Sequence, residues 1–574
     1  MTTITLDGES LTIEQLVRIA RDPSVRVERD RKTDDLVARS EALIANIVDN
    51  YRKAWGNGKP APHEYGVTTG FGEFKDKPIA PEDLEQLQRN LLLSHSVGVG
   101  DNTDPDDMSN YFPAEVVRGA LATRLNAFLK GHSGVRRKLV DIVQAMLNRG
   151  VIPLVPLRGS VGASGDLCPL SHLFAVLLGE GRFYVPGGGQ AILPARDLPG
   201  ILGFDAAEMQ PTFKEGLALV NGANFSAAML ALAVFDAGRL AEVADSAAAL
   251  SMEAVAGCTR ALDAKVHEER AHPGQIASAA RIRDLLAGSS LVERAGAVQD
   301  AYSIRCAPQV HGATRDTIGY VRAIAQREIN AATDNPLFFP DGDAPFDLSF
   351  RANWPQGYDG EKRLAYSAGN FHGQPLALAA DFLTIAVAEL ASISERRTAL
   401  LLDGNHNRGL PQNLTTRPGV NSGLMIAQYT SASLVSENKV LAHPASVDSI
   451  PTGANSEDHV SMSTHAARKM RSVVANTEAV LAIELLTASQ AVEWRVTFEL
   501  DPNRRAPKLL DTAGADQQAR EFESRVGGRA AEIAKSLGRG TREVYLRVRA
   551  LAEPVFRDRP LDEDIRKVRM SLRG

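Results

Sequence analysis

Cysteine is scarce in this chain, whose 574 residues contain only Cys168, Cys258 and Cys306. Thiols so few and so widely spaced exclude a disulfide framework and a zinc ribbon, and they favour a reducing compartment. The N-terminus lacks the basic start and the continuous apolar run of a signal peptide. We therefore expect a cytoplasmic protein.

The chain also has little excess charge of either sign and few aromatic residues. The formal net charge is −6, and no basic stripe or acidic tail is present, so nothing indicates a nucleic acid or an anionic membrane as a partner. Aromatic residues make up 6% of a chain that is 44% hydrophobic and rich in Ala and Leu. This composition favours closely packed helices over a sandwich of sheets.

One apolar stretch, residues 225–257, is long enough to resemble a membrane span. Charged residues recur along it, however, namely Asp236, Arg239, Glu242 and Asp245. Each charge would cost roughly 2.5–3.5 kcal/mol at the centre of a bilayer. We predict a buried helix instead.

Apolar residues at three- and four-residue spacing predict a mostly α-helical fold, beginning with a helix over 34–52. Longer helices are predicted at about 224–256, 311–331, 375–402, 419–442 and 459–496. Rods of this length favour an elongated bundle, and their apolar seams usually close by oligomerisation. Two short segments differ: 183–193 predicts a small hairpin, and 338–366 predicts a surface loop.

A chain of 574 residues exceeds the usual size of a single core. We expect an N-terminal region over 1–220, a central long-helix bundle over 221–500 and a C-terminal helical extension over 501–574.

The tripeptide Ala163-Ser164-Gly165, inside the string from Arg158 to His172, carries the strongest chemical signal. Glycine has no Cβ, so the Gly165 nitrogen can approach the Ala163 carbonyl and close a five-membered ring. Loss of two waters then leaves a methylidene group on the former serine, an electrophile that no standard side chain supplies. Taken alone, the tripeptide is also compatible with a turn before a helix.

Four separated motifs together point to a family. They are Tyr65-Gly-Val-Thr-Thr-Gly-Phe-Gly72, the string 158–172, Gln299-Asp-Ala-Tyr-Ser-Ile-Arg-Cys306 and Gly369-Asn-Phe-His-Gly373. In this order they resemble the aromatic amino acid lyases, which include histidine, phenylalanine and tyrosine ammonia-lyases and related aminomutases. The likeness runs from about Glu64 to about Trp494. It implies a mostly α-helical homotetramer with shared active sites, and a 4-methylideneimidazol-5-one (MIO) group formed autocatalytically from residues 163–165, without a metal.

The resemblance implies roles for several residues. Removal of ammonia from an α-amino acid needs a base for the Cβ proton, and Tyr65 on a glycine-rich flap matches the catalytic tyrosine of the family. Tyr302 and Arg305 lie three residues apart, on one face if helical. The family assigns Arg305 to the substrate carboxylate, with Tyr302 and Gln299 beside it. In isolation, Tyr65 would be read as a packed aromatic and Arg305 as half of an ion pair.

Two further residues match family positions. Asn221 corresponds to a polar contact to the prosthetic group or substrate, and Phe371 to a phenylalanine that packs on the substrate ring; otherwise they would be a turn residue and a core residue. His267 and His272 do not form a zinc motif, because their spacing of five does not place both imidazoles on one helical face.

Substrate choice depends on the pair Ser94-His95 and on Glu457. Histidine lyases of the family carry Ser-His at the first position, and Glu457 stands where phenylalanine and tyrosine lyases have no glutamate. An imidazole needs polar partners on both nitrogens, since an unpaired buried polar group costs about 1–3 kcal/mol. We therefore predict deamination of L-histidine to trans-urocanate.

The chain departs from the family pattern in three places: Gln374 stands where histidine lyases usually have glutamate, the segment 338–366 is longer than expected, and the region from Val496 lacks a firm match. Tyrosine, phenylalanine or substituted aryl-alanine lyase activity therefore remains an alternative, as does a 2,3-aminomutase. A catalytically inactive helical scaffold would require the tripeptide to stay uncyclised.

Overall fold

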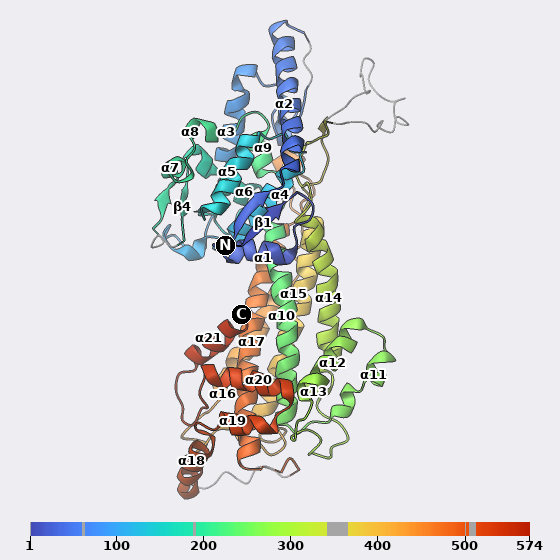
Figure 1. The fold of residues 1–574 in the computed structure, drawn as a ribbon, viewed down its shortest axis with the longest axis vertical. Helices are drawn as coiled ribbons and strands as arrows, with labels where there is room; N and C mark the ends of the chain where they lie inside the picture. Colours follow the sequence, from blue (N-terminus) through green and yellow to red (C-terminus); the bar gives the residue numbers. More distant parts are fainter. Residues whose placement is uncertain are drawn as a thin grey trace. The chain divides into compact units, whose positions relative to one another are not determined.

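The computed structural model describes residues 2–59, 63–186, 191–340, 365–499, 501–503 and 512–573. Contacts divide the chain into two compact units (Figure 1). The first unit contains Met1–Phe235, Arg322–Ala380 and Pro444–Arg468, and the second contains Asp236–Val321, Asp381–His443 and Lys469–Gly574. The three consecutive regions expected from the sequence, with boundaries at 220 and 500, stay a prediction.

The long helices expected from the periodicity are all present, which confirms a mostly α-helical fold. They are α10 (Asn224–Ala254), α14 (Ala307–Glu328), α15 (Gln374–Leu402), α16 (Met425–Leu441) and α17 (Ser463–Thr497). All except α16 have residues in both units.

Helix α10 confirms the prediction of a buried helix over the apolar stretch, since most of its side chains are inaccessible. Two other helices, α15 and α17, are long and apolar enough to cross a membrane. The most apolar window of each is 67% and 72% buried inside the structure, as in the core helix of a globular protein.

The described part of the first unit combines the 25-residue helix α2 and shorter helices with three small sheets. Its helices are α1 (Ile13–Arg21), α2 (Lys32–Gly56), α3 (Leu84–His95), α4 (Ala114–Leu129), α5 (Arg137–Asn148), α6 (Leu167–Ala175), α7 (Leu198–Leu202), α8 (Ala206–Met209) and α9 (Glu215–Val220), with the 3-10 turns η1 (Gly72–Phe74), η2 (Pro81–Asp83), η3 (Met108–Asn110), η4 (Val176–Leu178), η5 (Ala195–Asp197) and η10 (Gly453–Asn455). Its strands are β1 (Thr3–Leu6), β2 (Arg26–Arg29), β3 (Ile152–Pro153), β4 (Arg182–Tyr184), β5 (Leu193–Pro194), β6 (Leu337–Phe338) and β7 (Ala365–Tyr366).

Strands β4 and β5 pair antiparallel, with Phe183 opposite Leu193, which confirms the predicted hairpin. Its Gly187–Gly189 turn lies outside the described residues, as do residues 341–364 of the predicted surface loop. The ends of that loop, β6 and β7, form an antiparallel pair.

Helix α2 fixes the base of the flap that carries Tyr65. Its inward side chains Ile44, Val48 and Tyr51 recur at helical spacing and pack in one apolar cluster with Val67 and Leu84. Burying an apolar side chain of this size stabilises the fold by about 1.5–3 kcal/mol. Val67, two residues after Tyr65, is thereby held while the tip of the flap remains exposed.

The second unit contains η6 (Thr259–Leu262), α11 (Ala264–Glu268), α12 (Pro273–Leu286), α13 (Tyr302–Arg305), η9 (Gln412–Leu414), α16, α18 (Thr512–Val526), α19 (Ala530–Ile533), η11 (Ala534–Ser536), α20 (Arg539–Leu551) and α21 (Asp562–Ser571). The last helix of the extension is tied to α17 by a buried carboxylate: Glu478 accepts from Arg569 and Arg573 at 2.9 and 2.8 Å. The C-terminal extension is thus packed through charge pairs as well as apolar contact.

Candidate active site

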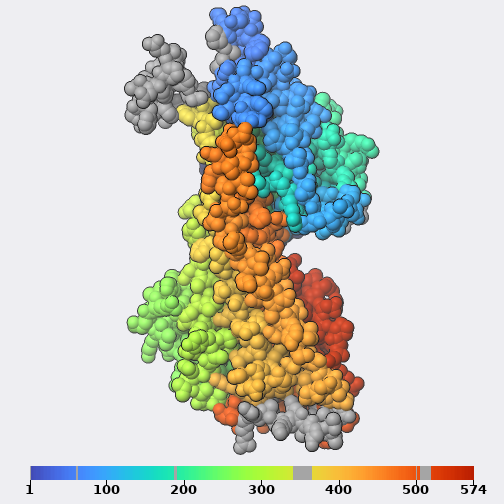
Figure 2. Space-filling model, turned by 180° about the vertical axis from the view of Figure 1, so that it is seen from behind, coloured from blue at the N-terminus to red at the C-terminus, as the bar shows by residue number. Residues whose placement is uncertain are grey.

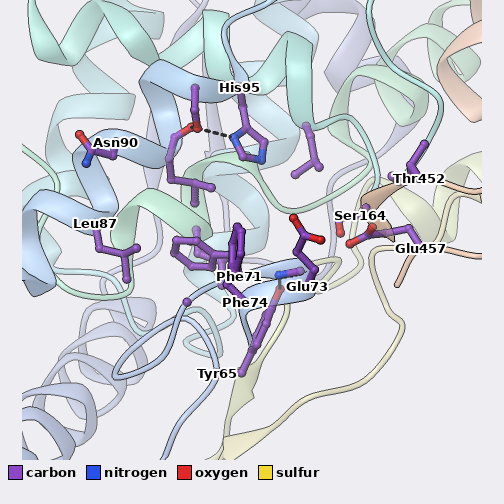
Figure 3. Close-up of a pocket in the computed structure, with 18 of the residues that line it drawn as sticks. Tyr65, Phe71, Glu73, Phe74, Leu87, Asn90, His95, Ser164, Thr452 and Glu457 are labelled. Atoms are coloured by element: carbon purple, nitrogen blue, oxygen red, sulfur yellow. Dashed lines mark hydrogen bonds between the residues drawn. The ribbon is translucent and has the colours of Figure 1, made fainter. Parts of the chain in front are cut away.

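A cavity of about 710 Å³ lies within the first unit (Figure 3). Its walls come from the flap 65–79, from helix α3, from the tripeptide loop and from residues 452–457. Six of the residues singled out from the sequence line it together: Tyr65, Ser94, His95, Ala163, Ser164 and Glu457. Residues almost 400 positions apart in the sequence thus meet around one space.

The tripeptide loop has a constrained backbone. Ser164 and Gly165 both have positive φ, 51° and 82°. Gly165 pairs with Gly222, whose N–H donates to the Ser164 carbonyl at 3.1 Å. A Cβ on Gly165 would lie 2.3 Å from the Gly222 carbonyl oxygen, so only glycine fits. A non-glycine residue in the left-handed region is strained, and such strain concentrates at functional sites.

Asp166, the residue after the tripeptide, anchors this loop through hydrogen bonds to its carboxylate. Its buried carboxylate accepts hydrogen bonds from the Ser226 amide at 2.8 Å, from the Ser226 hydroxyl at 2.7 Å and from the Thr464 hydroxyl at 2.5 Å. Burial raises the pKa of Asp166, and these hydrogen bonds oppose that rise. On the other side of the loop, the Met462 amide donates to the Val161 carbonyl at 2.9 Å.

Asn221 directly precedes Gly222 and is almost completely buried. Its side-chain amide donates to the Asn335 carbonyl at 2.7 Å. Its Oδ1 is buried with no hydrogen-bond partner among the described residues. A buried acceptor without a donor costs about 1–3 kcal/mol, so this atom is available to a further group. Asn221 itself does not line the cavity.

Tyr65 points into the cavity from the flap. Its Oη accepts a hydrogen bond from the Gly72 amide at 3.3 Å, and its ring meets that of Phe71 edge to face at 6.3 Å. Burial raises the pKa of Tyr65, and the nearby Glu457 carboxylate raises it further. In the isolated chain this hydroxyl is therefore protonated at neutral pH.

His95 ends helix α3, with its ring on the cavity wall. The Ser94 hydroxyl lies 3.0 Å from His95 Nδ1 and 3.3 Å from the Leu91 carbonyl (Figure 3). A neutral imidazole carries one N–H, so Nε2 is an acceptor when Nδ1 donates to Ser94 and a donor when the Ser94 hydroxyl donates to Nδ1. Burial lowers the pKa of His95, so the ring is neutral at pH 7.

Glu457 closes the cavity opposite α3. It pairs with Thr452 in a short antiparallel bridge around η10. Its two oxygens face the glycines of η1 and η10: a Cβ on Gly72 would lie 3.3 Å from Oε1, and one on Gly453 only 1.7 Å from Oε2. Burial is the largest cause that raises the pKa of Glu457, and Glu73 also raises it.

The other predicted site residues lie elsewhere in the chain. Phe371 is half-buried in the first unit but does not line the cavity. Gln299, Tyr302 and Arg305 belong to the second unit. There the Arg305 guanidinium lies 4.6 Å from the centre of the Tyr302 ring, which confirms that the two share a face. Tyr302 is 72% exposed.

Sequence reasoning did not single out the other polar cavity residues, among them Glu73, Lys77 and Asn90. The position of Glu73, directly after the Gly-Phe-Gly of the flap motif, was the available signal. No group of three or more His, Cys, Asp or Glu side chains in the described part of the chain is arranged to hold a metal ion.

Comparison with known proteins places this geometry in context. A family model described as aromatic amino acid lyase matches residues 11–514, more of the chain at both ends than the 64–494 expected from the motifs. A histidine ammonia-lyase from Caldanaerobacter subterraneus subsp. tengcongensis is 47% identical over 504 residues, which cover 87% of this chain and 90% of the relative.

Solved structures extend the similarity to the fold. A crystal structure of histidine ammonia-lyase from Trypanosoma cruzi has 36% identity and a TM-score of 0.78, covering 100% of this chain and 93% of the other. A tyrosine aminomutase from Streptomyces globisporus has 31% identity and a TM-score of 0.82, covering 100% and 97%. Enzymes with different named reactions therefore share this architecture.

Proposed function

Because the chain belongs to the aromatic amino acid lyase family, we propose that it removes ammonia from L-histidine and releases trans-urocanate. The observation that carries this proposal is the single cavity in which Ser164, Tyr65, His95 and Glu457 meet. The 47% identity with a histidine ammonia-lyase over most of both chains supports the same reaction.

The tripeptide fits an MIO group. Gly165 packs where a Cβ would collide with Gly222, and Ser164 already holds a left-handed backbone. The unpartnered Oδ1 of Asn221 lies just beyond the loop. The group, formed autocatalytically from Ala163-Ser164-Gly165, would supply the electrophilic carbon that takes up the substrate amine. Asp166 and Gly222 would hold it in place.

The side chains around it would handle the substrate. Tyr65 takes the proton from Cβ, and the flap excludes water while it does so. Arg305 holds the substrate carboxylate through its planar fork, with Tyr302 and Gln299 beside it. Phe371 packs on the substrate ring. Since none of these four side chains lines the cavity of the single chain, we propose that other subunits supply them and complete each site.

Histidine is the preferred substrate on this proposal because both imidazole nitrogens find partners. The Glu457 carboxylate can accept from the imidazole N–H, and His95 presents Nε2 on the opposite wall, where it can donate to the other ring nitrogen. A phenyl ring would leave both of these partly buried groups without a partner, which disfavours it relative to an imidazole.

A homotetramer in the cytoplasm is the proposed assembly. On the second unit, helices α15 and α16 leave large apolar side chains exposed, and the amber surface in Figure 2 belongs to this part of the chain. Phe382, Ile385, Ile426 and Tyr429 are 46%, 44%, 54% and 58% exposed. Exposed apolar side chains at helical spacing favour burial against further copies of the chain.

The second candidate is a lyase for other aromatic amino acids or a 2,3-aminomutase. It is favoured by Gln374 and by the shared fold with a tyrosine aminomutase. A product assay with histidine, tyrosine and phenylalanine side by side separates these reactions. We expect urocanate from histidine as the dominant product; a β-amino acid, or turnover of tyrosine with histidine inert, would overturn the proposal.

A further inference from the structure

The cavity contains a second carboxylate, that of Glu73, to which the reaction described above gives no role. Glu73 lies in η1, directly after Gly72 on the flap that carries Tyr65. Its side chain lines the cavity and points into it on the side of His95 and Glu457 (Figure 3). Among the described residues, no cation and no hydrogen-bond donor engages this carboxylate.

Geometry couples Glu73 to Glu457. Turns η1 and η10 lie against each other, and Gly72 approaches the Glu457 carboxylate so closely that a Cβ there would be 3.3 Å from Oε1. The charge of Glu73 is felt at Glu457, since it contributes to the raised pKa of that group. Two acidic side chains from distant parts of the sequence therefore face one space.

Like charges side by side are unfavourable unless a proton or a cationic group lies between them. Two lysines of the flap are near: Lys75 acts to lower the pKa of Glu457, against Glu73, and Lys77 lines the cavity with its ammonium over the Phe74 ring at 4.9 Å. The Glu73 and Glu457 carboxylates, when ionised, can only accept hydrogen bonds. This side of the cavity therefore favours a ligand that brings N–H donors or positive charge.

We propose that Glu73 is a specificity-determining residue, whose carboxylate acts with Glu457 and His95 to select a ring that carries N–H donors over an apolar ring. The inference rests on the proposed function, because it concerns the ring of the same substrate. In the closed site, an N–H of the ring would donate a charge-assisted hydrogen bond to the Glu73 carboxylate.

The test uses two unreactive ligands that differ only in the ring, 3-(imidazol-4-yl)propanoate and 3-phenylpropanoate. Their affinities are measured by calorimetry on the full-length protein and its Glu73→Gln and Glu73→Asp variants. Glu82→Gln is the matched control, because Glu82 is an exposed carboxylate of the neighbouring turn η2 that does not line the cavity.

We expect Glu73→Gln to weaken the imidazole ligand about tenfold and to change the phenyl ligand less than about twofold. Glu73→Asp should recover part of the loss, and Glu82→Gln should behave as the wild type. Equal weakening of both ligands would show that Glu73 only shapes the flap, and no weakening of either would show no role in the ring site; either result overturns the inference. So does a wild type that does not prefer the imidazole ligand.

Assays of histidine deamination test the proposed function separately from this inference. Neither ligand carries an amine, so the binding comparison does not depend on ammonia release. If the wild type fails to deaminate histidine, the proposed function fails, whatever the ligand pair shows. If Glu73→Gln raises KM for histidine and phenylalanine equally while the ligand pair is unaffected, Glu73 binds the substrate amine and the ring assignment is wrong.

Discussion

Ser164 and Gly165 show how a local backbone can be prepared for chemistry. Both residues have positive φ, and Gly165 packs directly on Gly222. The left-handed backbone of Ser164 costs about 1–3 kcal/mol of strain. Hydrogen bonds from Gly222, Ser226 and Thr464 to the loop maintain this conformation. Ring closure would convert this strained turn into a covalent group.

Intact mass tests that conversion. The purified protein should be lighter than its translated sequence by two waters, and Ser164→Ala should lack the deficit and nearly all activity. Gly165→Ala should also lack it, because its Cβ would lie 2.3 Å from the Gly222 oxygen. Gly179→Ala is the matched control: Gly179 has φ of 80° with no neighbour near a Cβ, so the deficit should remain. Folded wild type with the unmodified mass would contradict the MIO proposal.

The environment of Tyr65 predicts the pH dependence of the rate. Burial and Glu457 raise the pKa of Tyr65, so at neutral pH only a small fraction is the phenolate needed to take a proton. Below that pKa the ionised fraction grows tenfold per pH unit, so kcat should rise on going to alkaline pH. Glu457→Gln removes one cause of the raised pKa, and the rise should move to lower pH. Profiles of kcat against pH at saturating substrate, for the wild type and for Glu457→Gln, would show this shift. If the rise of kcat begins at the same pH in both proteins, another group is the base.

Ring selection predicts a change of substrate at His95. His95→Phe removes a polar partner of the imidazole and enlarges the apolar wall, so kcat/KM for histidine should fall about tenfold to a hundredfold while phenylalanine turnover rises or appears. Parallel assays with both substrates measure the ratio. A variant that loses both activities equally would indicate a folding defect in α3, which far-ultraviolet circular dichroism would detect.

At the scale of elements, helix periodicity predicted much of the fold and contact with distant segments set the rest. Residues 375–402 were predicted as a helix, and α15 covers Gln374–Leu402. The last long helix was predicted to begin at about 459, but α17 begins at Ser463, because the Met462 amide instead donates to the Val161 carbonyl beside the tripeptide and the Val460 amide donates to the Ser449 hydroxyl. Periodicity carries no information about such a contact.

The same limit applies to the site. Motifs indicated Tyr65, Ser164, His95 and Glu457, and the structure brings them into one cavity. Glu73 directly follows the Gly-Phe-Gly of the flap motif, but that position alone did not predict a role, since a glutamate on a glycine-rich loop is usually a solvated side chain. Its place in the cavity follows from the approach of η1 to η10, which depends on tertiary packing.

Helix α20 offers a test of how the C-terminal extension is held. Glu493 of α17 is fully buried and accepts from the Tyr545 hydroxyl at 2.9 Å and from Arg549 at 2.5 and 3.0 Å. Glu493→Gln leaves the Arg549 charge buried without a counter-charge, which should cost about 3–5 kcal/mol. We expect a lower denaturant midpoint and faster amide exchange in α20. Glu563→Gln, which breaks an exposed pair with Arg566, should leave both unchanged; equal effects would contradict this account.

At the scale of the whole molecule, the proposed tetramer predicts sharing of sites between chains. Mixing and refolding inactive Ser164→Ala and Arg305→Ala variants should restore activity, because some cavities then receive Arg305 from the other variant. Random mixing predicts roughly a quarter of the wild-type activity. Tyr65 and Ser164 line one cavity of one chain, so a Tyr65→Phe and Ser164→Ala mixture is the control and should stay inactive. A fully active monomer in sedimentation would contradict the shared site.

The interleaved course of the chain also sets an order of events during synthesis. The loop around Ser164 is held by the Met462 amide and the Thr464 hydroxyl, about 300 residues later. A ribosome must therefore have released residue 464 before the turn has all its hydrogen bonds. Until then the turn has only the contacts made by earlier residues such as Gly222 and Ser226. The reactive group would then arise only in chains whose two distant segments have met, so that its appearance reports completed folding of this unit.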